Sequence, residues 1–111
     1  MPETPQHAMV MNEDGSPRGV ADFDRIQSDA TLMMCEYAAA AGDDDAINAL
    51  TLEWVEKLDA DSMGYTTAAA IPLLARNIIA PMLEVLEVAA PQFNFRAKLI
   101  ESRDHARETL Q

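Results

Sequence analysis

The sequence predicts an all-α protein: a small bundle of three to four helices with a kinked central helix and an irregular N-terminal arm. Apolar residues recur at intervals of three and four between Phe23 and Leu110, while Val, Ile and Thr form no alternating runs, and the 111 residues include only four Gly. A chain of this length buries roughly two thirds of its extended surface, which is enough for one core without disulfides. We therefore expect residues 1–21 to be a flexible arm and residues 22–111 to be the helical bundle domain.

The N-terminal arm carries three Pro and two Gly among polar residues, with a short apolar patch at residues 8–11. This patch is consistent with a clamp onto the body, with one side of a weak hairpin closing on Val20, or with a partner-binding segment. An arm packed on the core is the arrangement we expect.

The first helix is predicted from about residue 22 to residue 41, with Asp22 as its N-cap and Gly42 as its C-terminal stop. Its inward stripe consists of Phe23, Ile26, Ala30, Met33, Tyr37 and Ala40. Asp43, Asp44 and Asp45 then open a second helix, where carboxylates accept from free N–H groups. The inward stripe of this helix consists of Ile47, Leu50, Trp54 and Leu58. A connection as short as Gly42 predicts an antiparallel or sharply angled pair of helices.

A loop is expected at residues 59–64, followed by a central helical segment over residues 65–90. Its apolar stripe is Ile71, Ala75, Ile78, Met82, Val85 and Ala89, and further apolar residues widen it beyond half of the circumference. We expect the other helices to pack on several sides of this segment, with a break or a start at Pro72 and a kink at Pro81. Asn94 is the expected N-cap of a last helix over residues 95–110.

Negative charge is confined to one half of the chain. Residues 1–62 hold fourteen Asp or Glu and three Lys or Arg, whereas residues 63–111 hold five of each. Such a field attracts basic partners and repels nucleic acid and anionic membranes. Cys35 is the only cysteine, so neither an internal disulfide nor a thiolate metal cage is expected. The N-terminus does not resemble a signal peptide, and we expect a cytoplasmic protein.

Residues 63–83 are the one stretch that resembles a membrane span. Arg76 and Asn77 lie near its centre, and an Arg at mid-bilayer costs roughly 3 kcal/mol. We therefore expect a buried helix and no membrane insertion.

No residue pattern predicts a catalytic or metal site, and we expect no cofactor. Di-iron bundles need Glu-x-x-His motifs, which this chain lacks, and its Glu53/Glu56 and Glu84/Glu87 pairs fall on outward sides. Cys35 has Glu36 beside it and no nearby cation in sequence, which is typical of an inert thiol. An enzyme would have to bring together two of Glu87, His105 and Cys35.

Three groups of residues are candidates for partner binding. Arg96, Arg103 and Arg107 fall within about 40° of one another around the last helix. They could grip a carboxylate-rich surface or a phosphate backbone, or pair with this chain's own acids, such as Asp104 and Glu108. The acidic residues Asp43, Asp44 and Asp45 could dock a basic partner or act only as solvated charge. Leu32 and Cys35 form, with Ala39, a second apolar strip that suggests a contact with another chain.

The sequence therefore predicts a non-enzymatic, soluble protein-interaction module: a small regulator, inhibitor or assembly factor. We expect a homo-oligomer or a complex with a protein that has a basic surface, because a short chain cannot cover so broad an apolar helix alone. No nucleic-acid or membrane partner is expected. The alternative function is an acidic decoy that blocks a nucleic-acid-binding protein, ahead of a small helical enzyme or a membrane-inserted protein.

Overall fold

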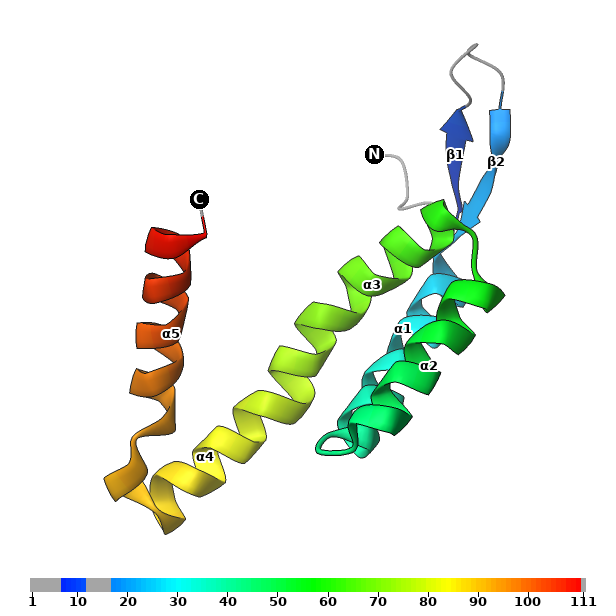
Figure 1. Ribbon diagram of the computed structural model, residues 1–111. Helices are drawn as coiled ribbons and strands as arrows, with labels where there is room; N and C mark the ends of the chain where they lie inside the picture. The colour runs from blue at the N-terminus through cyan, green and yellow to red at the C-terminus, as the bar shows by residue number, and fades with distance from the viewer. Residues whose placement is uncertain (1–6, 12–16, 111) are drawn as a thin grey trace, which may run out of the picture. The chain divides into compact units, whose positions relative to one another are not determined.

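The computed structural model describes the backbone of residues 7–11 and 17–110 and the side chains of residues 22–110. The chain divides into two compact units, Met1–Leu74 and Ala75–Gln111. This division follows the charge, because fourteen acidic and three basic residues belong to the first unit and five of each to the second. The fold class predicted from the sequence is confirmed: the body of the protein is a small all-α bundle (Figure 1).

The described part of the N-terminal arm forms a two-stranded antiparallel hairpin. Strand β1, His7–Met11, pairs with strand β2, Pro17–Asp22, and the register places Met9 opposite Val20. The hairpin closing on Val20 is therefore the one of the three possible arrangements that the backbone adopts. Periodicity did not predict these strands, because they are short and their side chains do not alternate. Residues 1–6 and 12–16 of the predicted arm lie outside the described residues.

Helix α1, Phe23–Ala40, begins and ends within one residue of its predicted bounds. Helix α2, Asp44–Lys57, begins at the acidic run, as predicted. The Asp22 carboxylate accepts a hydrogen bond from the Arg25 N–H at 3.1 Å, and Asp43 accepts one from Ala46 at the same distance. Gly42 links the helices at φ 91°, a conformation that other residues rarely adopt. These caps fix the short connection between α1 and α2.

Helix α3, Ala60–Leu74, begins earlier than predicted, and the expected loop at residues 59–64 is wrong. The Asp59 carboxylate accepts from the Ser62 N–H at 2.7 Å and so starts the helix directly after α2. Gly64 lies inside the helix, where it costs only about 1 kcal/mol relative to Ala.

The core of the first unit lies among α1, α2 and α3, which run side by side in Figure 1. Its buried cluster consists of Ala30, Met33, Leu50, Trp54 and Ala70. Helix α1 packs more extensively against α3 than against α2. Ala30 is fully buried and Ala70 nearly so, so the helix backbones approach each other closely through small side chains.

The predicted buried stripe on the central segment is wrong in this chain. Ile71 is 62% exposed and Met82 is 60% exposed. Helix α3 instead buries Thr66 and Ala70, and Leu73, which we had placed in the polar sector, packs against the core. The face that is buried is the one with small side chains, because it allows the closest approach to α1; the bulkier side chains remain outside.

The second unit begins with the π-helix η1, Ala75–Ile79, which continues into α4, Ala80–Ala89. A 3₁₀ turn, η2 at Pro91–Phe93, leads to α5, Phe95–Thr109. The break or start expected at Pro72 is wrong, because α3 runs through this residue to Leu74. Pro81 lies in the first turn of α4, directly after the π-helix. Asn94 occupies the N-cap position of α5 as predicted, but its backbone is left-handed (φ 48°) and its side chain makes no capping hydrogen bond.

Candidate interaction surface

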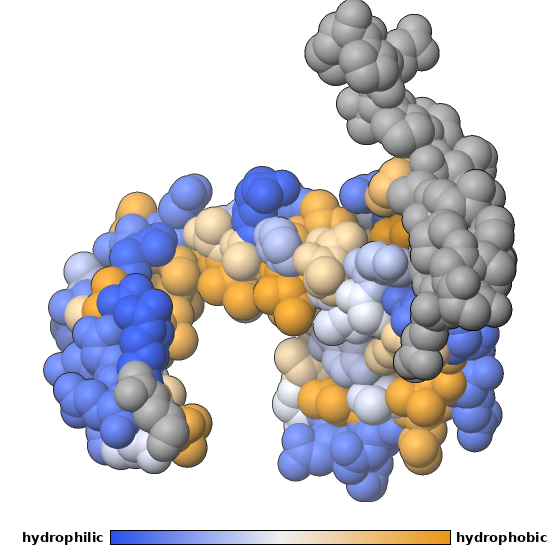
Figure 2. All heavy atoms as spheres, turned by 90° about the horizontal axis from the view of Figure 1, so that it is seen from above, coloured by the Kyte–Doolittle hydropathy of each residue, from blue (hydrophilic) through white to orange (hydrophobic). Residues whose placement is uncertain are grey.

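Helix α4 exposes a hydrophobic face, here called the α4 apolar face, formed by Met82, Val85 and Val88. These side chains are three residues apart, and Val88 is the most exposed of them at 85%. Leu83 is the only buried residue of α4. Figure 2 shows hydrophobic side chains (orange) gathered at the surface rather than enclosed. Most of the apolar area of α4 therefore faces outward in the single chain.

Helix α5 buries none of its fifteen residues. Leu99 is 53% exposed and Leu110, its C-cap residue, is 82% exposed. Phe95, Leu99 and Leu110 lie on one side of the helix and form the α5 apolar face. A helix stabilised mainly by packing needs a partner for such a face.

The three arginines of α5 are all half-exposed and pair with acids of the same unit. The Arg96 Nε donates to Glu87 Oε1 at 2.7 Å, which joins α5 to α4. Arg103 contacts the Asp104 carboxylate at 3.0 Å, and Arg107 lies 4.0 Å from the same group. A guanidinium has five N–H donors, and each of these pairs uses only one or two of them. The arginines therefore retain capacity to bind a further carboxylate or phosphate.

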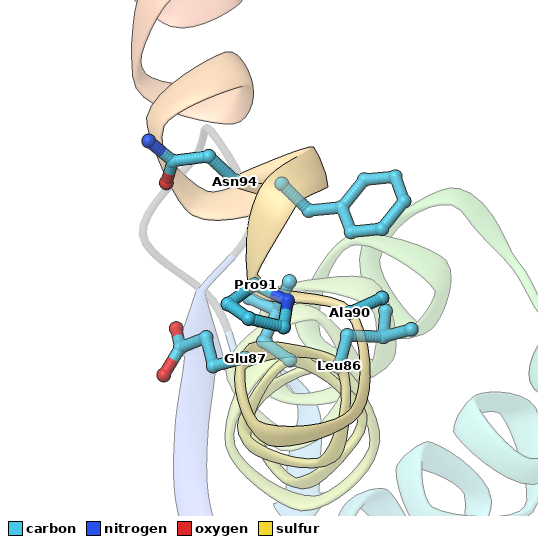
Figure 3. A pocket seen from close by; sticks show the side chains of 7 residues that line it. Leu86, Glu87, Ala90, Pro91 and Asn94 are labelled. Atoms are coloured by element: carbon cyan, nitrogen blue, oxygen red, sulfur yellow. The ribbon is translucent and has the colours of Figure 1, made fainter.

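A pocket of about 310 Å³ lies where α4 turns into α5 (Figure 3). Its lining consists of Leu83, Leu86, Glu87, Ala90, Pro91, Asn94 and Phe95. The volume is at the lower end of the range for ligand pockets. Glu87 is the only titratable group in the lining, and its carboxylate accepts from Arg96. The lining is therefore mostly apolar, with one carboxylate that is already ion-paired.

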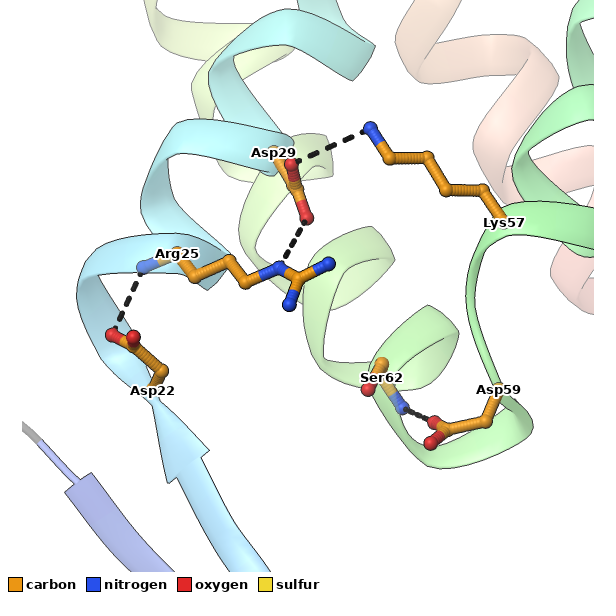
Figure 4. A network of polar contacts seen from close by, with 6 residues as sticks. All are labelled: Asp22, Arg25, Asp29, Lys57, Asp59 and Ser62. Atoms are coloured by element: carbon orange, nitrogen blue, oxygen red, sulfur yellow. Dashed lines mark hydrogen bonds and ion pairs between the residues drawn. The ribbon is translucent and has the colours of Figure 1, made fainter.

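Acidic residues of the first unit have different tasks. Asp29 lies 3.8 Å from Arg25 and 3.9 Å from Lys57, an arrangement that ties α1 to α2 (Figure 4). Asp43 caps α2, while Asp44 and Asp45 are exposed in the first turn of α2. Asp43 therefore has a structural role, and only its two neighbours are available for docking.

Leu32 and Cys35 lie on the exposed side of α1, where the sequence analysis placed them with Ala39. The neighbouring Glu36 accepts a hydrogen bond from Trp54 Nε1 at 3.0 Å and is thereby engaged in joining α1 to α2. No group of three or more His, Cys, Asp or Glu side chains that could hold a metal ion occurs among residues 22–110.

Sequence reasoning missed an exposed apolar pair on α2. Leu52 is 63% exposed and Val55 is 56% exposed, on the side of the helix opposite the buried Leu50 and Trp54. We had described this side only by its glutamates. The sequence contained this signal, because Leu52 and Val55 lie outside the predicted inward stripe of the helix. Large apolar residues in such positions indicate an exposed apolar surface.

Among the described residues, one helical run is long and apolar enough to cross a membrane by length and composition. It spans Ala60–Ala89 and contains a window of 18 residues with a mean hydropathy of 1.5, of which 6% is buried. Arg76 and Asn77 are both exposed within this run.

No protein-family model, curated protein or solved structure matches this chain.

Proposed function

We propose that this chain is a non-enzymatic protein-interaction module that self-associates through the second unit. The observation that carries the proposal is the burial of α4 and α5: between them these two helices bury only Leu83. Burial of one Val, Leu or Met side chain contributes about 1.5–3 kcal/mol. The α4 and α5 apolar faces together hold five Val, Leu or Met side chains and one Phe, all exposed or half-exposed. Covering them in a complex therefore provides a substantial driving force for association.

A module of this kind acts by presenting a helical surface, as a small regulator, inhibitor or assembly factor does. The ion pairs that the arginines of α5 form at the surface support this role. The surface arginines beside the α5 apolar face form exposed ion pairs, which contribute little to stability, at most about 1 kcal/mol each. Such residues give orientation and specificity at an interface.

The test is the molar mass in solution, measured by size-exclusion chromatography with light scattering over a concentration series. We expect a mass above the 12.2 kDa of one chain that rises with concentration. Val85→Asp should shift the mass towards the monomer because it places a charge on the α4 apolar face. Glu84→Gln, an exposed neighbour outside that face, is the matched control and should behave as the wild type. A wild-type chain that stays monomeric at millimolar concentration would refute the proposal.

A membrane-inserted protein is a second candidate, favoured by the length and hydropathy of Ala60–Ala89. Arg76 and Asn77 oppose it, because both would lie in the hydrocarbon core. Fractionation of expressing cells separates the two functions. Recovery only in membranes, with extraction by detergent but not by high salt, would favour insertion; a chain that is soluble without detergent would exclude it.

A further inference from the structure

We propose that the arginine side of α5 in one copy docks on the outer side of α2 in a second copy. This inference rests on the proposed self-association and adds to it a contact between the second unit of one copy and the first unit of the other. The two surfaces come from different units, one acidic and one with equal numbers of acidic and basic residues.

The outer side of α2 has charges at its ends and apolar residues between them. Asp45, Ala49, Leu52 and Glu56 follow one another at intervals of four, three and four residues. At 100° per residue they fall within about 60° of one another, and Val55 borders them. All five side chains are exposed. No ion pair engages Asp45 or Glu56 within the part of the chain whose side chains the structure describes.

The arginine side of α5 carries the opposite charge at both ends of the same spacing, with Arg103 as a third cation between them. Arg96, Ile100, Arg103 and Arg107 have the same intervals of four, three and four residues, and Leu99 borders them as Val55 borders the α2 set. All five of these side chains are exposed. The surface therefore offers cations where the outer side of α2 offers carboxylates.

The two patterns also match in length. The terminal charges on each helix are eleven residues apart, which is about 16.5 Å along an α-helix. When the helices lie antiparallel, Asp45 meets Arg107 and Glu56 meets Arg96 at once. Leu52 then covers Ile100, and Arg103 lies over Ala49. Burial of the apolar centre excludes water from the flanking ion pairs and strengthens them.

The ion pairs within the second unit do not compete with this docking. Glu87 and Asp104 hold the three guanidiniums through one or two donors each, so a second carboxylate can be added without breaking the first contact. The internal pairs instead restrict the arginine side chains before docking, so that less side-chain conformational entropy is lost when the complex forms.

Charge reversal on each surface tests the proposal. The α5 variant carries Arg96→Glu and Arg107→Glu, the two end charges, and the α2 variant carries Asp45→Lys and Glu56→Lys. We expect each variant to weaken self-association by about tenfold or more in sedimentation equilibrium, because attraction becomes repulsion. A chain carrying all four substitutions should recover the wild-type affinity, since the charges are again opposite. The control Glu101→Lys with Glu108→Lys changes the other side of α5 and should leave the affinity unchanged.

Circular dichroism checks that each variant folds. A variant that does not fold is replaced by its neutral counterpart at the same positions, with Arg→Gln on α5 or with Asp→Asn and Glu→Gln on α2. Recovery in the fourfold variant supports the docking of α5 on α2. If the single-surface variants associate as the wild type does, or if the fourfold variant fails to recover, this docking is wrong although the chain still self-associates. If the wild type is itself monomeric, the proposed function fails as well.

Discussion

Leu50 tests whether the buried cluster of the first unit is what holds α1, α2 and α3 together. It is only 9% exposed and packs beside Trp54 in that cluster. A Leu→Ala change at a buried site costs about 2–5 kcal/mol, and the position of Leu50 at the margin of the cluster places it at about 2–3 kcal/mol. A unit of this size has a free energy of unfolding of about 4–11 kcal/mol, so the loss is a large fraction of its stability.

The assay is urea unfolding followed by Trp54 fluorescence. Trp54 is the only tryptophan of the chain and lies in the first unit, so its signal reports on that unit. With a slope near 1 kcal/mol/M, the midpoint should fall by about 2–3 M urea. Dilute protein is needed so that self-association does not contribute.

Leu52→Ala is the matched control, the same substitution two residues further along α2. Because Leu52 is 63% exposed, its replacement should change the free energy of unfolding by no more than about 0.5 kcal/mol in dilute protein. Equal losses for Leu50→Ala and Leu52→Ala would refute the assignment of the inner and outer sides of α2.

Five further substitutions, in three experiments, test individual positions. Asp43→Ala should lower the stability of the first unit by about 1 kcal/mol, because the Ala46 N–H loses its cap, and Asp44→Ala should cost less; thermal unfolding by circular dichroism measures both. Gly64→Ala should raise the stability by about 0.5–1 kcal/mol, since a Cβ there meets nothing within 4 Å, whereas Gly42→Ala should lower it because of the positive φ; opposite signs in the same unfolding assay are required. Glu87→Gln should change thermal stability by less than about 1 kcal/mol, since both partners of its ion pair with Arg96 are half-exposed, and a larger loss would mean that this pair holds the turn between α4 and α5.

Helix ends were predictable from the sequence because they depend on local chemistry. Asp22, Gly42 and Asp43 each act within four residues of their own position, and each was assigned correctly. The start of α3 depends on the same kind of local contact, the cap formed by the Asp59 carboxylate, which the prediction of a loop at residues 59–64 did not include.

The buried side of α3 was not predictable from periodicity. The stripe that contains Ile71 and Met82 is the more hydrophobic one, yet α1 packs against the side that contains Thr66 and Ala70. That choice depends on how closely two backbones can approach, which a single helix pattern does not contain. By contrast, the candidate surface on α5 was visible in the sequence as three arginines. The exposed pair Leu52 and Val55 was also predictable, because both lie outside the predicted inward stripe of α2.

The π-helix η1 makes Ala75–Ile79 the weakest part of the helical run. None of its five residues is buried, and its backbone bonds follow the i→i+5 pattern rather than the regular ladder. Pro72, just before it, has no N–H to contribute. Opening this segment therefore breaks few contacts, and its amide hydrogens should exchange with solvent faster than those of α1. A protease acting briefly on the native chain should cut here first, after Arg76 in the case of trypsin, and release a fragment that keeps the Trp54 core intact.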